Sequence, residues 1–544
     1  IGLLVGELAA MTLFSNAITQ RMDAEAAARA ASTPAVATAQ GQLDALRTNR
    51  GALEPLSLTP GRGPLVFTAG NDITLGAGST VAVDGKKGGE ITVQARTGTL
   101  LADGSLAARG AAGKGGDIQL LGHQVGLVNA AQVDASGATG GGTVLVGGDY
   151  QGANAGVQNA FRTYVGPQST ITADALQQGD GGKVIVWADD ATRFYGSISA
   201  RGGSQSGNGG FVETSGKEYL EANGSVDASA PAGLAGQWLL DPRNITINTA
   251  GPTSGGTALP NFDATADNAV VDRDDIQTSL NTGTNVTITT GSTGTQAGNI
   301  TVASAIAKTA GGNATLTLNA ANNIVFNSGA NVGSTAGQLG FTLNAGGGIN
   351  NLRGVSLNGG TLTLNAAGAV TQSSPITGNT TVVKNGAGTF TLSQSNTYTG
   401  ATTVNAGTLA LGASNVLANG SSLVVNGGTF NIANRSDTVA GVQLLSGAIT
   451  GTTGTLTSTS AYDVQAGTVS ARLGGTAGLT KTTSGTVTLS GANTYTGATN
   501  INAGTLALGA SNIIANASAV TVAAGATFNL AGYSETIGSL AGAG

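Results

Sequence analysis

NTYTGAT at residues 396–402, followed by NAGTLALGASN at residues 405–415, occurs twice in this chain. The second copy stands at residues 493–499 and 502–512, 97 residues further along and with the same internal spacing. A repeat at fixed spacing indicates a supersecondary unit that buries its apolar face by stacking on its neighbours. Within the unit, Thr408–Leu411 alternates polar and apolar side chains as a strand does, between turn-forming Gly and Asn. We therefore expect an all-β fold, a right-handed parallel β-helix.

Composition favours a solenoid over a compact globular core. The chain contains 89 Gly, 4% aromatic and 10% charged residues, yet 40% of its residues are hydrophobic, which argues against disorder. In a solenoid, small and β-branched side chains stack from coil to coil, so no bulky centre is needed. A net charge of −6 over 544 residues gives no basic surface for nucleic acid. The absence of cysteine excludes disulfides, iron–sulfur clusters and thiolate zinc sites.

The N-terminal residues differ from the rest of the chain. Residues 1–18 are largely apolar, but Glu7 interrupts them and no basic segment precedes them as it would in a signal peptide. We consider this segment a candidate for the end of a membrane helix, and the one place where the chain would contact a membrane. Residues 20–51 are rich in alanine and predict a helix, which the prolines after residue 54 end. A short α-helical N-terminal segment is thus expected over residues 1–60.

Paired glycines recur from residue 66 onward, each pair followed by an alternating apolar strand. The pairs start at residues 88, 115, 141, 181 and 209, at steps of 27, 26, 40 and 28 residues. The near-equal steps predict coils, and the long step predicts a coil with an extruded loop over residues 148–166. Glycine readily takes the positive φ that a sharp turn between sheets requires, so we expect the pairs to serve as turn residues.

A short helix is predicted between two stretches of strands. Residues 272–280 begin with acidic side chains and are followed by Gly283, which is typical of a helix with an aspartate cap and a glycine stop. Alternating strands resume from residue 286. The region from residue 241 to residue 283 is therefore a candidate seam between two solenoid blocks.

Two sets of motifs resemble exported bacterial proteins. The repeat described above resembles the passenger repeat of Gram-negative autotransporters. Four motifs in the first half are similar to large filamentous-haemagglutinin-type proteins exported by two-partner secretion; these are GDYQG at 148–152, GGKVIVWAD at 181–189, GGFVETSG at 209–216 and GQWLLDPRNITI at 236–247. The resemblance implies export through an outer-membrane transporter barrel and a location at the cell surface or outside a Gram-negative bacterium. The chain lacks that family's Asn-Pro-Asn-Leu secretion signature and a C-terminal barrel, so we expect an interior fragment.

The motifs and composition together predict five segments. They are a helical N-terminal segment at 1–60, a haemagglutinin-like β-helix block at 66–247, a turn-rich seam with a short helix at 248–283, a β-helix continuation at 284–379, and autotransporter-type passenger repeats at 380–544.

The sequence gives little support for covalent chemistry. Asp189 and Asp190 are adjacent, and neighbours in a strand point to opposite faces, so we interpret them as a solvated turn rather than an acid and base pair. Asp274 and Asp275 suit a helix N-terminus. His123 is the only histidine and cannot build a histidine-rich metal site. The glycine–aspartate turns are not tandem calcium-binding repeats, and no phosphate-binding loop is present. We predict no catalytic residue, no cofactor and no metal site.

Aromatic side chains are the remaining candidates for ligand contact. On a solenoid they stack on sugars or anchor a protein partner when exposed, although each more often packs inside a coil. The candidates are Tyr150, Tyr164, Trp187, Tyr195, Trp238, Tyr398 and Tyr495. Asparagine and threonine ladders between coils are expected to be structural.

We expect a non-enzymatic adhesin or surface-filament segment, which displays binding loops toward host-cell or matrix glycans and proteins. One alternative is a carbohydrate-active β-helix, a polysaccharide lyase or hydrolase, which three or more carboxylates converging on one face of neighbouring coils would favour. Another is a structural spacer without a ligand, which uniformly short loops and no exposed aromatic patch would favour.

Overall fold

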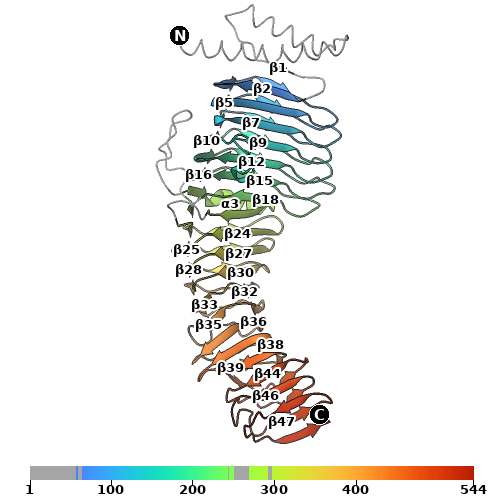
Figure 1. Cartoon of the computed structure of the whole chain (residues 1–544), viewed down its shortest axis with the longest axis vertical. Coiled ribbons are helices and arrows are strands. Elements are labelled where there is room, and N and C mark those ends of the chain that lie inside the picture. The colour runs from blue at the N-terminus through green and yellow to red at the C-terminus, as the bar shows by residue number, and fades with distance from the viewer. Residues whose placement is uncertain (1–56, 59–63, 243, 250–268, 292–296, 544) are drawn as a thin grey trace, which may run out of the picture. The chain divides into compact units, whose positions relative to one another are not determined.

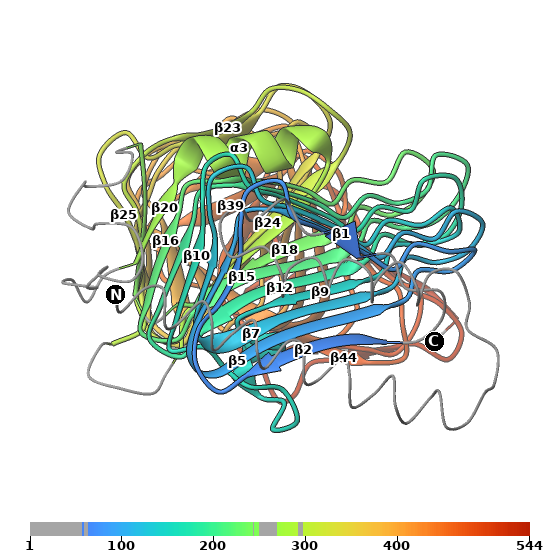
Figure 2. The same cartoon turned by 90° about the horizontal axis from the view of Figure 1, so that it is seen from above.

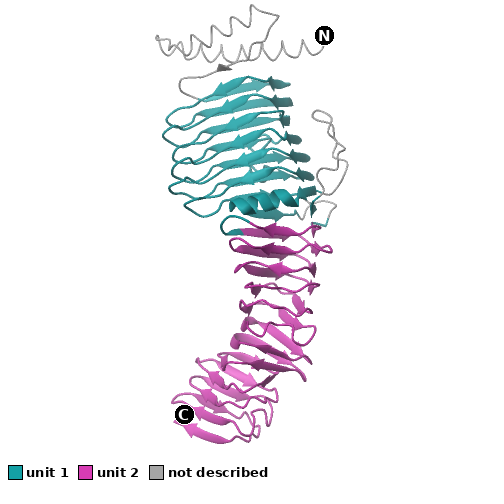
Figure 3. Cartoon of the chain, turned by 180° about the vertical axis from the view of Figure 1, so that it is seen from behind, with its two compact units in different colours: residues 1–298, 310–314 teal, residues 299–309, 315–544 magenta. Residues whose placement is uncertain are grey.

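The computed structural model describes residues 57–58, 64–242, 244–249, 269–291 and 297–543, and it shows a parallel β-helix (Figure 1). Neighbouring coils in the described part pair through parallel strands in register. The predicted all-β solenoid is confirmed. The helical segment predicted at residues 1–60 lies outside the described residues, apart from β1 (Ser57–Leu58). The chain divides into two compact units, one of residues 1–298 and 310–314 and one of residues 299–309 and 315–544 (Figure 3).

Unit 1 has three faces of stacked strands. The first is a seven-stranded sheet of β1, β4 (Thr80–Ala82), β6 (Ser105–Ala107), β8 (Gln132–Asp134), β11 (Thr170–Thr172), β14 (Ser197–Ser199) and β17 (Ser225–Asp227). The second holds β2 (Leu65–Ala69), β5 (Glu90–Ala102), β7 (Asp117–Leu127), β9 (Thr143–Val146), β12 (Lys183–Ala188), β15 (Phe211–Gly216), β18 (Gln237–Leu240) and β21 (Asn285–Thr289).

The third face of unit 1 begins where β5 and β7 bend. It continues through β3 (Ile73–Leu75), β10 (Arg162–Val165), β13 (Ala191–Phe194), β16 (Tyr219–Ala222), β19 (Ile245–Asn248) and β20 (Ala269–Asp272). A register shift in the pairing of β5 with β7, between Ala95 and Thr99, allows each of these strands to serve two faces.

Unit 2 contains the remaining strands of the described residues, except that Ala314 at the start of β24 belongs to unit 1. They are β22 (Ile300–Val302), β23 (Ile306–Lys308), β24 (Ala314–Ala320), β25 (Ile324–Phe326), β26 (Val332–Ser334), β27 (Leu339–Ala345), β28 (Ile349–Leu352), β29 (Val355–Ser356), β30 (Thr361–Ala366), β31 (Val370–Gln372), β32 (Thr381–Lys384), β33 (Thr389–Leu392), β34 (Thr402–Val404), β35 (Thr408–Leu411), β36 (Ser422–Ala433), β37 (Asp437–Val439), β38 (Gly441–Gly451), β39 (Thr455–Ser458), β40 (Tyr462–Val464), β41 (Gly467–Val469), β42 (Arg472–Gly474), β43 (Leu479–Lys481), β44 (Thr486–Leu489), β45 (Thr499–Ile501), β46 (Thr505–Leu508), β47 (Ala519–Val522), β48 (Thr527–Asn529) and β49 (Ser539–Gly542).

Aliphatic ladders fill the interior of unit 1. On the second face, consecutive strands place Val144, Val184, Val212, Trp238 and Val286 opposite one another, and none of these side chains has exposed surface. Because each residue stacks on an equivalent residue of the next coil, most of the apolar area is buried by small aliphatic side chains, and Trp238 is the one large side chain in this row. This arrangement explains how a chain with few aromatic residues keeps a dry core.

The paired glycines lie where neighbouring coils come closest. A Cβ on Gly141, Gly181 or Gly209 would stand 1.9, 2.0 or 1.8 Å from a carbonyl oxygen of the next coil. None of these three has a positive φ, whereas Gly140, Gly179 and Gly207 do. Our expectation that the pairs supply the positive φ is therefore wrong. They are glycine because no side chain fits between stacked turns, which lie over one another when the molecule is seen from above (Figure 2).

The predicted helix is confirmed as α3 (Arg273–Thr282) in unit 1. Asp272 is its N-cap, since its carboxylate accepts a hydrogen bond of 2.7 Å from the Asp274 backbone N–H, and Gly283 ends the helix with a φ of 95°. Ile276 and Leu280 point into the core. The sequence signals at the two ends therefore predict the first and last residues of this helix to within one or two positions.

Asparagine ladders run along unit 2, as predicted. Asn344 donates to Asn319 over 2.6 Å and Asn365 donates to Asn344 over 2.5 Å. A second ladder joins residues 385, 405 and 426 over 2.7 and 3.0 Å. Each amide is both donor and acceptor, so identical side chains at one position satisfy each other from coil to coil.

Candidate functional site

Three of the predicted ligand-contact aromatics lie in the interior. Trp238, Tyr398 and Tyr495 have no exposed surface. The Trp238 indole N–H donates to the Thr214 hydroxyl over 2.9 Å, inside the second face of unit 1. A ligand on the surface cannot stack on these three rings as they are buried in this structure. Trp238 follows the strand alternation of β18, which turns it inward. Tyr398 and Tyr495 instead lie between strands, before β34 and β45, and turn inward with their hydroxyls bonded to Thr402 and Thr499.

A strap of residues 148–160 explains the positions of Tyr150 and Trp187. The strap includes the 3-10 helix η1 (Tyr150–Gly152) and crosses the outer side of the second face. The predicted loop over residues 148–166 is confirmed in place, but it ends earlier because residues 162–165 form β10. Trp187 is 4% exposed beneath the strap, and Tyr150 is 43% exposed with its ring edge against Phe211, 5.7 Å between centroids.

Carboxylates hold the strap from below. The Gln151 backbone N–H donates to both oxygens of Glu213, over 3.2 and 3.3 Å, and the Gln151 side-chain amide donates to Asp241 over 2.8 Å. Burial raises the pKa of Glu213 to about 7, although the Gln151 N–H bond opposes that shift. Burial likewise raises the pKa of Asp241. No local pattern indicates this cluster, because Glu213 and Asp241 stand 62 and 90 residues from Gln151 in the chain.

The strap is also fixed at its two ends. Asp149 accepts a hydrogen bond of 2.5 Å from the Lys183 ammonium. Burial alone would raise the pKa of Asp149, but hydrogen bonds from Asn154 and Lys183 outweigh it and lower the pKa. At the other end, Asp189 accepts hydrogen bonds of 3.1 Å from both Asn159 and the Trp187 indole.

Tyr164 and Tyr195 are the two predicted aromatics that the structure brings together. Their rings meet edge to face, 5.8 Å between centroids, and both are partly exposed on the third face of unit 1. The strand register places Tyr164, Arg193 and Glu221 opposite one another on β10, β13 and β16. We call Tyr164, Arg193, Tyr195, Tyr219 and Glu221 the tyrosine strip.

An ion pair forms the centre of the tyrosine strip. Arg193 and Glu221 lie 3.2 Å apart, with 10% and 7% of their side chains exposed. The Tyr219 hydroxyl donates to Glu221 over 3.3 Å. Burial and the Glu221 charge raise the pKa of Tyr219 to about 12 and that of Tyr195 further still. Both phenols therefore stay protonated and able to donate at neutral pH.

The remaining titratable candidates have structural partners. Asp190 pairs with Arg162 over 2.9 Å, and His123 stacks on Phe161, 5.5 Å between centroids. In α3, burial first and the neighbouring carboxylates second raise the pKa of Asp275 to about 7. Within the described residues, no three His, Cys, Asp or Glu side chains gather as a metal site would require.

The repeat residues in unit 2 build the same hydrogen bonds in both copies. The Tyr398 hydroxyl bonds the Thr402 hydroxyl over 2.6 Å, and the Tyr495 hydroxyl bonds that of Thr499 over 2.8 Å. The turn conformations also match, since Asn415 and Asn512 have φ of 56° and 55°, and Gly407 and Gly504 have φ of 63° and 66°. The repeated sequence thus specifies a repeated backbone.

Buried lysines cap the interior of the same coils. Lys384 has no exposed surface, and its ammonium donates to the carbonyl oxygens of Gly386 and Ala406. In the second copy, Lys481 donates to those of Thr483 and Ala503. Residues 382–411 and 479–508, which contain these lysines, each align with a known family model. Both segments match the passenger-associated-transport-repeat. The passenger repeats support an autotransporter passenger, exported by an outer-membrane transporter and secreted or displayed at the cell surface.

No curated protein matches the chain significantly. None of the helices within the described residues has the length and apolar character that crossing a membrane needs.

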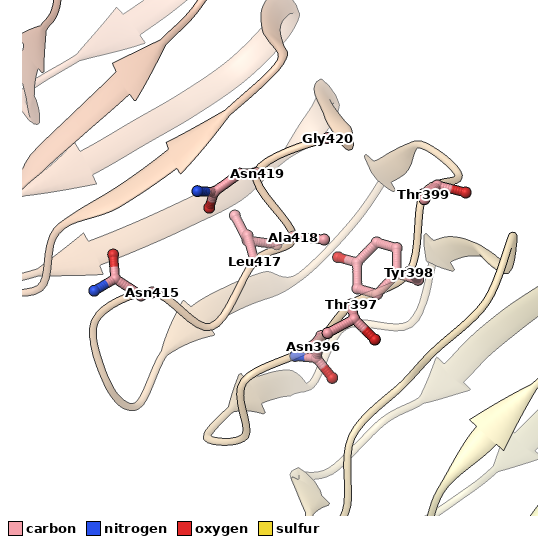
Figure 4. Close-up of a pocket in the computed structure, with 9 residues that line it drawn as sticks. All are labelled: Asn396, Thr397, Tyr398, Thr399, Asn415, Leu417, Ala418, Asn419 and Gly420. Carbon is pink, nitrogen blue, oxygen red and sulfur yellow. The ribbon is translucent and has the colours of Figure 1, made fainter.

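A shallow cavity of about 340 Å³ adjoins the first passenger repeat (Figure 4). Residues 396–399 line one side, and Asn415 with residues 417–420 line the other. Its exposed side chains are those of Thr397, Thr399, Asn415 and Asn419, which carry no charge. Such a cavity can offer hydrogen bonds but has no group for acid–base catalysis.

The buried lysines of unit 2 are expected to make its stability depend on pH. Burial lowers the pKa of Lys384 from 10.5 to about 8, and it lowers those of Lys308 and Lys481 as well. Between pH 8 and 10.5 the unfolded chain binds more protons than the folded chain, so stability is expected to rise with pH. Above pH 10 ionisation of unfolded tyrosines opposes this rise, because burial raises the pKa of Tyr398 and Tyr495.

Urea unfolding followed by circular dichroism at pH 7.5 and 9.5 tests this expectation. The midpoint should be higher at pH 9.5, and the difference should shrink in Lys384→Met, which keeps the length of the side chain without its charge. An equal midpoint at both pH values in the native chain would contradict it.

Proposed function

We propose that the chain is a segment of an exported bacterial adhesin or surface filament, whose β-helix displays contact residues toward host-cell or matrix glycans and proteins. The passenger repeats carry this proposal, because they are built into the coils of unit 2 as structural elements. Stacked coils present side chains at a fixed spacing, so weak contacts on one face act together. Two-partner secretion of the filamentous-haemagglutinin type stays part of the proposal, supported by the motifs of unit 1.

The tyrosine strip is the contact surface that we propose within unit 1. Tyr164 and Tyr195 offer partly exposed rings, and aromatic side chains are enriched where proteins contact partners. Their neighbours Arg193 and Glu221 hold the rings in place through the strand register. A rigid aromatic pair binds with little loss of side-chain entropy.

We propose no enzymatic role, although one observation favours the carbohydrate-active alternative. Glu213 and Asp241 both bond Gln151, and Asp149 stands two residues before Gln151 on the strap, so three carboxylates belong to one region of neighbouring coils, as such an enzyme would need. In this structure Glu213 has no exposed surface, and Gln151 occupies both it and Asp241. A sugar cannot reach Glu213 while the strap is in place.

Binding of the purified chain to host-cell and glycan panels tests the proposal, with soluble sugar products measured in the same wells. Tyr164→Ala combined with Tyr195→Ala is expected to weaken binding at least about 10-fold, since truncating a central aromatic contact commonly costs that much. Tyr398→Phe is the matched control, because Tyr398 is buried.

Three outcomes distinguish the alternatives. Unchanged binding of the double variant would remove the tyrosine strip as the contact surface. Release of sugar products that Glu213→Gln abolishes would establish the enzyme instead. Binding to no member of the panels would favour the spacer.

A further inference from the structure

The strap over the second face of unit 1 is joined to the coils beneath it by three sets of ionisable groups, and by uncharged hydrogen bonds of Gln158 with Gln94 and with the Arg96 carbonyl. Its centre reaches Glu213 and Asp241 through Gln151, one end reaches Lys183 through Asp149, and the other end reaches Asp189 through Asn159. Beneath it lie apolar side chains that would otherwise face water, namely those of Leu145, Ile185, Trp187 and Phe211. The strap is thus a cover over an apolar patch of the sheet.

Glu213 occupies an unusual place in this patch. Strand register puts it in one row with Leu145, Ile185 and Leu239, all of which are buried. Its carboxylate has no exposed surface when the strap is closed. If the strap lifted, the same side chain would face solvent, because it points outward from the sheet while Val212 and Thr214 point inward.

From these contacts we propose that the strap is a pH-dependent cover, held closed when Glu213 is protonated and released as Glu213 becomes ionised above neutral pH. Closing the strap removes Glu213 from water, so the closed state favours the neutral acid. In the open state water reaches the Glu213 carboxyl, and its pKa returns to the ordinary range of a glutamate. Closure is therefore coupled to proton uptake, and rising pH shifts the equilibrium toward the open state.

The other charges near Glu213 modify this coupling without reversing it. Asp241, beyond the end of β18, adds a negative charge that favours protonation of Glu213, and burial raises the pKa of Asp241 in the same direction. Lys183 on β12 favours ionisation, but its ammonium is paired with Asp149 on the strap. Ser215 on the same strand and the Gln151 N–H also favour the ionised form, and burial still outweighs all three. Asp189 bonds the far end of the strap.

Two glycines of the strap provide a way to force it open. A Cβ on Gly152 would lie 2.5 Å from the Trp187 indole nitrogen, and Gly152 has a φ of 60°. A Cβ on Gly148 would lie 2.7 Å from the same ring. Gly152→Ala should therefore hold the strap away from Trp187 at every pH, and it serves as an open reference.

Hydrogen exchange of the full chain, followed by mass spectrometry from pH 5.5 to 8 and corrected for intrinsic rates, tests the proposal. Exchange of strap peptides that contain Gln151 should increase on the order of 10- to 100-fold across this range, as a pKa that differs by about two units between the states implies. The turn at residues 76–79, where the Ser79 N–H donates to Gly76, should show no such increase.

Variants distinguish coupling of strap opening to ionisation of Glu213 from a general loss of stability of unit 1 at higher pH. Glu213→Gln should abolish the pH dependence, Asp241→Asn should reduce it, and Gly152→Ala should exchange fast throughout. Acrylamide quenching of tryptophan fluorescence gives a second readout, since Trp187 lies under the strap and Trp238 is fully buried. Equal corrected exchange at all pH values in the native chain, or an undiminished increase in both Glu213→Gln and Asp241→Asn, would overturn the proposal.

Discussion

Replacing Gly209 by alanine is expected to destabilise unit 1 by about 3 to 5 kcal/mol, because overpacking against fixed backbone is among the costliest single changes. The new Cβ would lie 1.8 Å from the Ala228 carbonyl oxygen and 2.3 Å from the Gly236 nitrogen. Both are backbone atoms of the next coil, so relief requires separating two coils that are joined by a strand ladder. Urea unfolding monitored by tryptophan fluorescence measures the effect, since Trp187 and Trp238 both belong to unit 1.

Gly76→Ala is the matched control for Gly209→Ala. A Cβ on Gly76 would meet nothing within 4 Å, and its φ is not positive. Alanine there should change stability by less than about 1 kcal/mol and can stabilise by restricting the unfolded chain. Similar unfolding midpoints for the two variants would contradict the close approach of the coils.

Replacing Asn396 by alanine is expected to destabilise unit 2 by about 2 to 4 kcal/mol, because a buried amide that satisfies several groups is lost. The Asn396 side chain donates to the Val416 carbonyl over 2.6 Å and accepts from the Ile376 N–H over 2.7 Å and from Gln372 over 2.6 Å. Alanine would remove the acceptor of the Ile376 N–H and of the Gln372 amide, while the Val416 carbonyl would keep only its bond of 3.2 Å from the backbone N–H of residue 396. Calorimetry or circular dichroism measures the loss.

The second passenger repeat offers an internal comparison for Asn396→Ala. Asn493 donates to the Ile513 carbonyl over 2.9 Å and accepts from the Leu473 N–H over 2.9 Å, so Asn493→Ala should also destabilise, by a smaller amount. Asn419→Ala, at an exposed position of the cavity beside the first repeat, should have little effect. A loss for Asn419→Ala as large as that for Asn396→Ala would refute the assignment.

The period-two pattern and the spacing of the repeat are sufficient to predict the coils, and the acidic start and glycine stop are sufficient to predict α3. They are sufficient because strand alternation and capping are local, as Thr408–Leu411 and the Asp272 cap show. The reason for the glycine pairs was missed, since the nearest atom to a Cβ on Gly209 belongs to Ala228 in the next coil. Contacts between coils depend on how the coils stack. They cannot be predicted from the local sequence, and Gly209 does not need a positive φ to make them.

The candidate site was harder to predict than the fold. The aromatic residues were chosen by type, yet Trp238 and Tyr398 lie inside and only Tyr164 and Tyr195 meet at the surface. The burial of Glu213 cannot be predicted from its position, because an acidic residue at an outward strand position normally faces solvent. Its burial results from the strap, whose Gln151 precedes Glu213 by 62 residues in the chain.

The close packing of neighbouring coils at the glycine pairs limits which insertions the β-helix can accept. A single extra residue inside a strand would turn every later side chain of that coil to the wrong side, while a whole added turn would reproduce the same cross-section and leave its neighbours in register. The strap lies at a corner where β9 has ended and β10 has not begun, so its extra residues leave both ladders intact. New surface loops in such a protein are therefore expected to arise at the corners between faces. A longer or shorter solenoid is expected to arise by gain or loss of whole coils.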